Sequence, residues 1–170
     1  MNKLTAEDVL AIADSHRFPT DADLYYPFLT ELALALEPEV SVELGTALGK
    51  GAYSIAQGLT NGKVYTIDNN PSIFLEEFYH SKMFRITGDT RTCELISKID
   101  LLFIDGHHDF ETVSTDYKRW LPQVNEGGII LFDDANHWGP GELLSSVPHH
   151  NIGWLHSYKE TGFAFLIKDA

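Results

Sequence analysis

The sequence predicts an α/β fold in which a doubly wound, mostly parallel β-sheet ends in a C-terminal antiparallel hairpin. Short segments rich in β-branched residues alternate with helical patterns, which is typical of a parallel sheet covered on both faces. These predicted strands span 40–44, 64–67, 84–87, 101–104 and 129–132. Segments 152–158 and 163–167 are joined by a short connection that contains glycine, which predicts the hairpin. The length of 170 residues predicts a single domain, with a helical cap over 1–39 and a core over 40–170.

The N-terminal cap contains two predicted helices. Thr5 caps the first, and Asp8 stands at the reciprocal position of a capping box. The second follows a cap at Thr20 or Asp21, and its apolar residues recur at four-residue spacing. It must end before Pro38, because proline cannot continue a helix.

A loop with three glycines follows the first core strand and is the strongest functional signal. Glu43 lies near the end of that strand, and the glycines are Gly45, Gly49 and Gly51. Glycine accepts positive φ and lets backbone N–H groups approach a ligand, and the helix expected over 52–58 points its positive end at a bound anion. The spacing fits neither a P-loop nor a dinucleotide fingerprint, so ATP and NAD sites of those types are disfavoured.

The second core strand ends in Asp68, where a carboxylate can accept hydrogen bonds from both ribose hydroxyls of a nucleoside. The spacing Glu-x-Gly-x-x-x-Gly-x-Gly over 43–51 resembles the first motif of class I S-adenosylmethionine-dependent methyltransferases, a family with a Rossmann-like fold. The resemblance implies S-adenosylmethionine as the cofactor, bound by this loop, Thr46 included. It also identifies Gly88 and Asp89 as the adenine-side element, in which Asp89 accepts from the exocyclic amine.

Three aspartates follow two further strands. Asp105 comes directly after one strand, and Asp133 and Asp134 come directly after another. Because the carboxyl ends of neighbouring parallel strands meet at one crevice, we expect these carboxylates to converge and repel one another. A divalent cation would relieve the repulsion, and oxygen ligands favour Mg²⁺, Ca²⁺ or Mn²⁺. The alternative is that the acids only decorate loops, as Asp109 does if it caps the next helix.

The residues expected at this crevice resemble a particular branch of the methyltransferases. The motif F-I-D-G-H-H-D-F over 103–110, followed by W-L-P-x-x-x-x-G-G-I-I-L-F-D-D over 120–134, is similar to small-molecule O-methyltransferases, including sugar methyltransferases of antibiotic pathways, and to the type 24 methyltransferase family. The likeness covers residues 40–136. In the metal-dependent branch, the corresponding acids bind Mg²⁺, which transfers to the three aspartates named above. Asp105 is also expected to border the cofactor.

Two histidines are candidates for the base, and we place His107 ahead of His108. Relatives commonly carry Asp two residues after the first metal ligand, where this chain has His107. Type 24 relatives favour His at the next position, which matches His108, and His137 is a weaker third candidate. Many relatives have Ser where Gly51 stands, so we expect backbone N–H groups to hold the methionine carboxylate here.

Composition limits the partners. With 25 acidic and 12 basic residues, the formal net charge is −13, which disfavours nucleic acid and anionic membranes. No apolar run approaches a transmembrane length, so we expect a cytoplasmic protein. The expected partner is a small-molecule methyl acceptor, and a homo-oligomer is left open.

These observations predict an S-adenosylmethionine-dependent methyltransferase that methylates an oxygen of a small molecule with divalent-metal help. A metal-dependent hydroxylase-like or hydrolase-like enzyme on the same scaffold is one alternative. It is disfavoured by the absence of a His-Glu-x-x-His motif. The other alternative is a non-catalytic cofactor-binding subunit.

Overall fold

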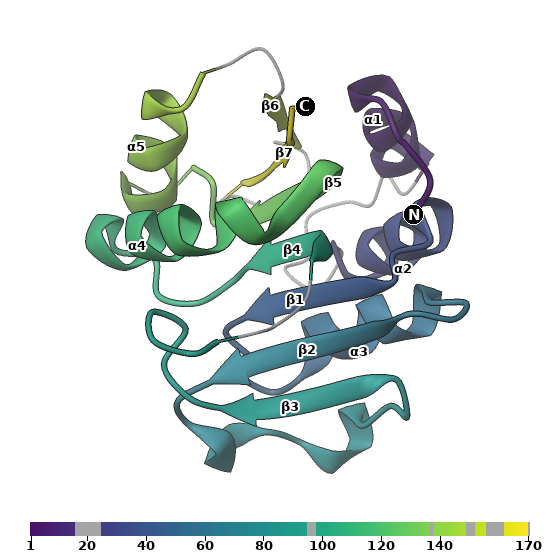
Figure 1. Cartoon of the computed structure of the whole chain (residues 1–170), viewed down its shortest axis with the longest axis vertical. Coiled ribbons are helices and arrows are strands. Elements are labelled where there is room, and N and C mark those ends of the chain that lie inside the picture. The colour runs from purple at the N-terminus through teal and green to yellow at the C-terminus, as the bar shows by residue number, and fades with distance from the viewer. Residues whose placement is uncertain (16–24, 95–97, 137, 149–151, 156–161, 170) are drawn as a thin grey trace.

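The computed structural model describes residues 1–15, 25–94, 98–136, 138–148, 152–155 and 162–169. They form a seven-stranded sheet between two helical layers (Figure 1). Five strands run parallel to one another: β1 (Val40–Leu44), β2 (Lys63–Asp68), β3 (Met83–Thr87), β4 (Ile99–Ile104) and β5 (Val124–Asp133).

The strand order is β3-β2-β1-β4-β5-β7-β6. Strand β7 (Phe163–Ile167) pairs antiparallel with β5, and β6 (Ile152–Trp154) pairs antiparallel with β7. The predicted fold class, a doubly wound and mostly parallel sheet with C-terminal antiparallel strands, is confirmed. The order reverses between β1 and β4, so their carboxyl ends border the crevice where such sheets bind ligands.

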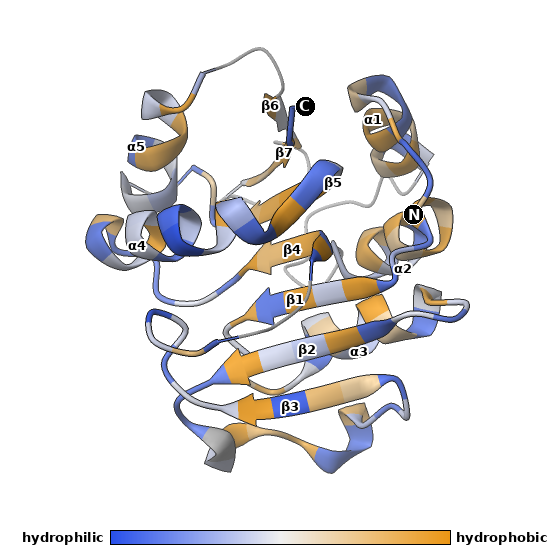
Figure 2. Cartoon of the chain, in the orientation of Figure 1, coloured by the Kyte–Doolittle hydropathy of each residue, from blue (hydrophilic) through white to orange (hydrophobic). Residues whose placement is uncertain are grey.

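Helices cover the two faces of the sheet in separate layers. One layer holds α1 (Ala6–Ser15), α2 (Tyr25–Leu36) and α3 (Lys50–Gly58), and the other holds α4 (Phe110–Trp120), the short turn η3 (Leu121–Gln123) and α5 (Trp138–Ser146). Alternate strand residues face opposite layers, because side chains alternate along a strand. Phe103 packs with the first layer, whereas Leu102 and Ile104 pack with the second. Apolar residues concentrate in α2 and the central strands (Figure 2).

The first helix begins as predicted. Thr5 Oγ1 accepts a hydrogen bond from Asp8 N at 3.2 Å, and Asp8 Oδ2 accepts from Thr5 N at 2.8 Å. These bonds form the capping box and lower the pKa of Asp8. The predicted cap of the second helix, Thr20 or Asp21, lies outside the described residues. That helix ends at Leu36.

Not every crossover contains the predicted helix. The β2–β3 connection instead forms two 3₁₀ turns, η1 (Pro71–Ile73) and η2 (Glu76–Phe78). The described part of the β3–β4 connection contains no helix either. A local reason is that the side-chain oxygen Oδ1 of Asn70 accepts from Ser72 N at 3.3 Å, which favours a turn. The edge strand β3 is therefore partly uncovered, and Phe84 is 47% exposed beside Tyr65. Within the described ranges, no helix is long and apolar enough to cross a membrane.

Candidate functional site

The glycine loop joins β1 to α3 and is pressed against the neighbouring strand ends. Gly45 has φ +96, and its N–H donates to the Ile67 carbonyl at 2.9 Å. A Cβ at this position would lie 2.2 Å from the Asp105 carbonyl oxygen. Only glycine fits this approach without a backbone shift. Gly49, the residue before α3, also has positive φ, at +95.

Gly51 has a different reason to be glycine. A Cβ there would lie 2.1 Å from Glu43 Oε1 and 3.1 Å from the ring of Phe103. The Glu43 side chain, which is buried, therefore occupies the space that a serine would need.

Asp68 ends β2 and organises the loop. Its Oδ2 accepts from the backbone N–H of Thr46 at 2.9 Å and of Ala47 at 3.0 Å. Its Oδ1 accepts from Asn70 N at 2.7 Å. Asp68 thus holds two loops together while it faces the cavity described next. Its predicted role at the ribose stays a prediction.

A cavity of about 350 Å³ lies at the carboxyl ends of β1, β2, β3 and β4. Its walls include five residues that the sequence analysis assigned to the cofactor site: Gly45, Asp68, Gly88, Asp89 and Asp105. The predicted base His107 also lines it, as do Asn70, Ile73, Arg91 and Thr112, which sequence reasoning missed. The other predicted cofactor residues lie beside this cavity, in the strand, the loop and the start of the helix: Glu43, Thr46, Gly49 and Gly51.

Asp89 is held by an arginine. Arg91 Nε donates to Asp89 Oδ1 at 2.9 Å, and Arg91 Nη2 donates to Oδ2 at 2.7 Å. These hydrogen bonds lower the pKa of Asp89 to about 2. The carboxylate is therefore charged and oriented at neutral pH. The Asp-x-Arg spacing after a strand was the sequence signal that could have revealed this pair.

Helix α4 supports both loops of the crevice. Asp109 Oδ1 accepts from Thr112 N at 2.9 Å, so the predicted helix cap is confirmed. From the far end of the helix, Trp120 Nε1 donates to the Thr90 carbonyl at 2.9 Å. Asp116 is buried between these ends, and burial raises its pKa. The helix thus fixes the adenine-side loop relative to the loop that carries the histidines.

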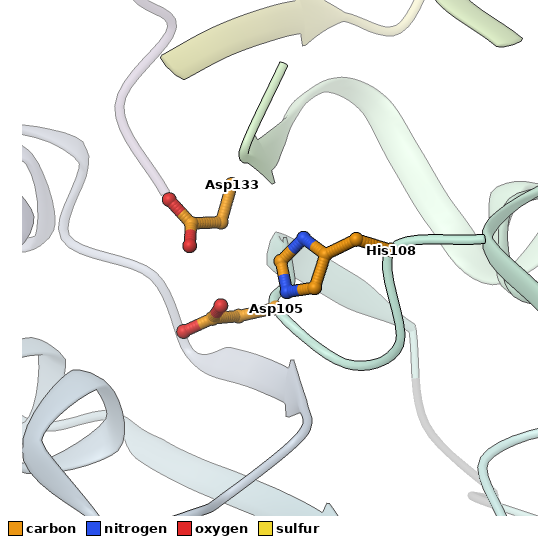
Figure 3. Close-up of side chains that lie close together, drawn as sticks. All are labelled: Asp105, His108 and Asp133. Atoms are coloured by element: carbon orange, nitrogen blue, oxygen red, sulfur yellow. The ribbon is translucent and has the colours of Figure 1, made fainter. Parts of the chain in front are cut away.

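The acid cluster consists of Asp105, His108 and Asp133. Each offers one ligand atom, and these atoms lie within 4.8 Å of one another. Figure 3 shows the imidazole reaching from the β4–α4 loop towards the two carboxyl groups, with one ring nitrogen on the side of Asp105. Asp133 is 6% exposed, so the carboxyl group that it contributes to this cluster is buried at the end of β5. Two of the three predicted metal ligands therefore converge.

Asp134 contacts His108, and its predicted role as a metal ligand stays a prediction. Its Oδ2 lies 3.0 Å from Nδ1 of His108, and it is not part of the three-residue cluster. Asp134 has φ +51, a left-handed conformation that differs from the extended backbone of the preceding strand. His108 takes the third position in the cluster instead. His107 is exposed and lines the cofactor cavity, and His137 lies outside the described residues.

Tyr25, at the start of α2, was missed by sequence reasoning. It is 5% exposed and stacks on Phe163, with ring centroids 5.4 Å apart. Phe163 is the register partner of Asp133, so the tyrosine lies beside the acid cluster. Burial and the charges of Asp105 and Asp133 raise its pKa. No local signal in the sequence brings α2 to this sheet edge, because the contact is long-range.

Comparison with known proteins identifies a family. The model of a family described as a methyltransferase domain, type 24, matches residues 42–135, which is more than half of the chain. This chain is 28% identical over 162 residues to uncharacterized protein y4gI of Sinorhizobium fredii, covering 76% of this chain and 18% of that protein. It is 46% identical over 44 residues to uncharacterized protein R132 of Acanthamoeba polyphaga mimivirus, covering 25% and 20%. It spans about a fifth of the length of these relatives.

Solved structures share the fold at low identity. The methyltransferase PaMTH1 of Podospora anserina, bound to S-adenosylhomocysteine, has a TM-score of 0.72 at 17% identity, covering 95% of this chain and 88% of that one. An O-methyltransferase of Bacillus cereus in complex with S-adenosylhomocysteine has 0.66 at 19%, covering 95% and 90%. The O-methyltransferase TomG of Streptomyces achromogenes, in complex with S-adenosylmethionine, has 0.64 at 16%, covering 100% and 93%.

The match to the family model includes the glycine loop, the cavity-lining strand ends and the acid cluster as far as Ala135. The fold of the whole chain agrees with it. The chain belongs to the type 24 family of methyltransferase domains.

Proposed function

We propose that this chain is an S-adenosylmethionine-dependent methyltransferase that methylates an oxygen atom of a small molecule with the help of a divalent cation. The position of Asp105 carries the proposal. Asp105 lines the cavity beside the glycine loop, and it also belongs to the cluster with His108 and Asp133. The cavity and the cluster therefore share one residue, so a methyl donor in the first would lie beside an acceptor in the second.

The cofactor side fits an adenosine group. The similar structures named above contain S-adenosylmethionine or S-adenosylhomocysteine, which supports the same ligand here. Asp68 accepts three backbone N–H groups, and a carboxylate has about four acceptor positions, so it keeps capacity for a ribose hydroxyl. Asp89 is charged and can accept from the exocyclic amine.

The acid cluster fits a divalent cation. The two carboxylates of the cluster offer oxygen ligands that suit Mg²⁺ or Mn²⁺, and Mg²⁺ is usually held by one or two carboxylates together with water and substrate oxygens. Asp105 and Asp133 would hold it. A cation at this place would lower the pKa of an acceptor hydroxyl and fix its direction.

His108 is the proposed proton acceptor. Its Nδ1 faces Asp134 at 3.0 Å, which favours the tautomer with the hydrogen on Nδ1 and leaves the lone pair on Nε2. Asp134 is then a positioning residue for the imidazole. When the acceptor oxygen attacks the methyl carbon, the C–O bond forms, the C–S bond breaks, the sulfonium charge is lost and the hydroxyl proton passes to Nε2. The chain contributes mainly alignment and exclusion of water.

The alternatives receive less support. A hydroxylase of the non-haem iron type uses two histidines and one carboxylate, whereas the cluster found among the described residues has one histidine and two aspartates. The charge of −13 is unsuited to a nucleic-acid acceptor. A small hydroxylated acceptor, such as a sugar or a catechol, suits a cation that contacts one or two adjacent oxygens.

Calorimetry with S-adenosylhomocysteine tests the cofactor assignment. We expect binding in the micromolar range by wild type, and weaker binding by Asp68→Ala. A screen of hydroxylated acceptors with methyl-labelled S-adenosylmethionine and Mg²⁺ or Mn²⁺ tests the reaction. Binding of NAD or ATP without any binding of S-adenosylhomocysteine or S-adenosylmethionine would overturn the proposal.

A further inference from the structure

A chain of hydrogen-bonded side chains lies beneath the glycine loop, away from the reacting atoms. Glu43 on β1 and Thr66 on β2 are direct partners in the parallel register of these strands. The Thr66 hydroxyl donates to Glu43 Oε2 at 2.5 Å, and its oxygen lies 2.6 Å from Thr46 Oγ1. Glu43 is 1% exposed and Thr66 fully buried, so water does not compete for these bonds.

These hydrogen bonds connect the sheet to the glycine loop. A hydroxyl has a single hydrogen, so if Thr66 donates to Glu43, the hydroxyl of Thr46 must donate to Thr66. Thr46 is then held twice, since its backbone N–H also donates to Asp68 at 2.9 Å. The next residue, Ala47, has φ +41, a conformation that side-chain-bearing residues rarely adopt and that surrounding contacts must maintain. Thr66 supplies one of these contacts through Thr46.

The side-chain carboxyl group of Glu43, at the end of this series of hydrogen bonds, has mainly uncharged neighbours. Gly51 of α3 packs against Glu43, the Ala52 backbone hydrogen-bonds to it, and the charged group that acts on it is Asp68 of β2. Burial raises the pKa of Glu43 to about 8, while hydrogen bonds from Thr66 and from the Ala52 backbone oppose the rise. Removal of the Thr66 hydroxyl is therefore expected to raise the pKa of Glu43 further.

We propose that Thr66 is a positioning residue of the cofactor loop, which couples Glu43 to Thr46 and holds the loop in the shape that binds the cofactor. The inference rests on the proposed binding of S-adenosylmethionine. It adds a residue that lies outside the glycine motif and outside the cavity wall, and it gives Glu43 a task in loop geometry.

Calorimetry with S-adenosylhomocysteine tests the proposal with two variants of one residue. Thr66→Val keeps the shape but removes the hydroxyl, and we expect roughly 5- to 10-fold weaker binding, the effect of one buried hydrogen bond. Thr66→Ser restores the hydroxyl and should bind as wild type does. Ser41→Ala is the matched control, because Ser41 is also buried in the sheet but its hydroxyl has no hydrogen-bond partner among the described residues.

A second measurement separates positioning from general damage to the fold. The titration midpoint of Glu43 is followed by carbon-13 NMR of its carboxyl carbon, assigned as the signal that Glu43→Gln loses. Thr66→Val should move this midpoint to higher pH, and Thr66→Ser should leave it in place. An unmoved midpoint, or wild-type affinity in Thr66→Val, overturns the proposal alone. If wild type binds neither S-adenosylhomocysteine nor S-adenosylmethionine, the proposed function fails first and this inference fails with it.

Discussion

The cofactor side and the acceptor side of the crevice use their carboxylates differently. On the cofactor side, Asp68 accepts three backbone N–H groups and Asp89 pairs with a neighbouring arginine. On the acceptor side, Asp105 and Asp133 gather around His108. The first pair shapes the loops of the protein itself, whereas the second brings like charges together at one place. The comparison teaches that the cofactor side is organised before a ligand arrives, while a cation on the acceptor side would relieve charge repulsion.

The largest expected effect is the loss of kcat when His108 is removed from the acceptor side. His108→Ala should lower kcat by roughly 10²- to 10⁴-fold, the usual contribution of a general base, without changing the affinity for S-adenosylhomocysteine. Asp134→Asn should cost less, about 10- to 100-fold, because it removes only the partner that orients the imidazole. Single-turnover methyl transfer measures both.

His107→Ala is the matched control for this experiment. His107 lies on the same loop but is exposed and lines the cofactor cavity. We expect its loss to leave the transfer rate near that of wild type. If His107→Ala loses as much rate as His108→Ala, the base assignment to His108 is wrong.

A substitution at Gly45 in the glycine loop should disrupt the cofactor side. Gly45→Ala places a Cβ 2.2 Å from the Asp105 carbonyl oxygen at a φ of +96. We expect a loss of about 3 kcal/mol in the free energy of unfolding, which lowers the Tm by about 10 °C, and loss of cofactor binding. Gly88→Ala is the control for the free energy of unfolding alone, since the nearest atom to its Cβ would be Cys93 Sγ at 3.6 Å. Equal losses in both variants would show that the strand-end packing is not specific to Gly45.

Divalent cations should distinguish the two sides, because we expect them to bind only on the acceptor side. Mn²⁺ at about 100 times its dissociation constant should stabilise the wild type by about 2.7 kcal/mol, read as a rise in Tm. Asp105→Asn combined with Asp133→Asn should abolish the rise, and Asp134→Asn should keep most of it. If Asp134→Asn abolishes it as completely, the three aspartates predicted from the sequence are the better ligand set.

Local patterns were read correctly from the sequence. The capping box of Thr5 and Asp8 and the cap at Asp109 depend on residues three positions apart, so spacing alone determines them. The strand ends at Asp68 and Asp105 follow from buried runs of β-branched and apolar residues. Their meeting at one crevice follows from parallel topology.

The remaining features depend on geometry that spacing does not encode. Asp134 was grouped with the other aspartates, but His108 joins Asp105 and Asp133 in the cluster, and Asp134 Oδ2 lies 3.0 Å from Nδ1 of His108. Tyr25 reaches the cluster only because α2 packs across the sheet, a contact between distant segments. The helix expected between β2 and β3 is replaced by turns, which the Asn70-Pro71 pair could have indicated.

Glu43 provides a smaller test on the cofactor side, through pH. Its pKa is raised from 4.5 to about 8 by burial, so the folded protein binds a proton that the unfolded chain has released. This contribution to stability is complete below pH 4.5 and is lost as pH rises towards 8. Between pH 6 and 7.5 the wild type should lose about 2 kcal/mol relative to Glu43→Gln. Parallel stability curves from urea unfolding of the two proteins would contradict the assignment.

If a methyl donor and a divalent cation meet at Asp105, carbon-13 NMR of methyl-labelled S-adenosylmethionine with Mn²⁺ should detect that they are close together. A paramagnetic ion broadens the signals of nearby nuclei, so the methyl signal of the bound cofactor should broaden strongly when Mn²⁺ is added to wild type. The broadening should disappear in Asp105→Asn combined with Asp133→Asn. A sharp methyl signal in wild type that has bound both S-adenosylmethionine and Mn²⁺ would contradict the account.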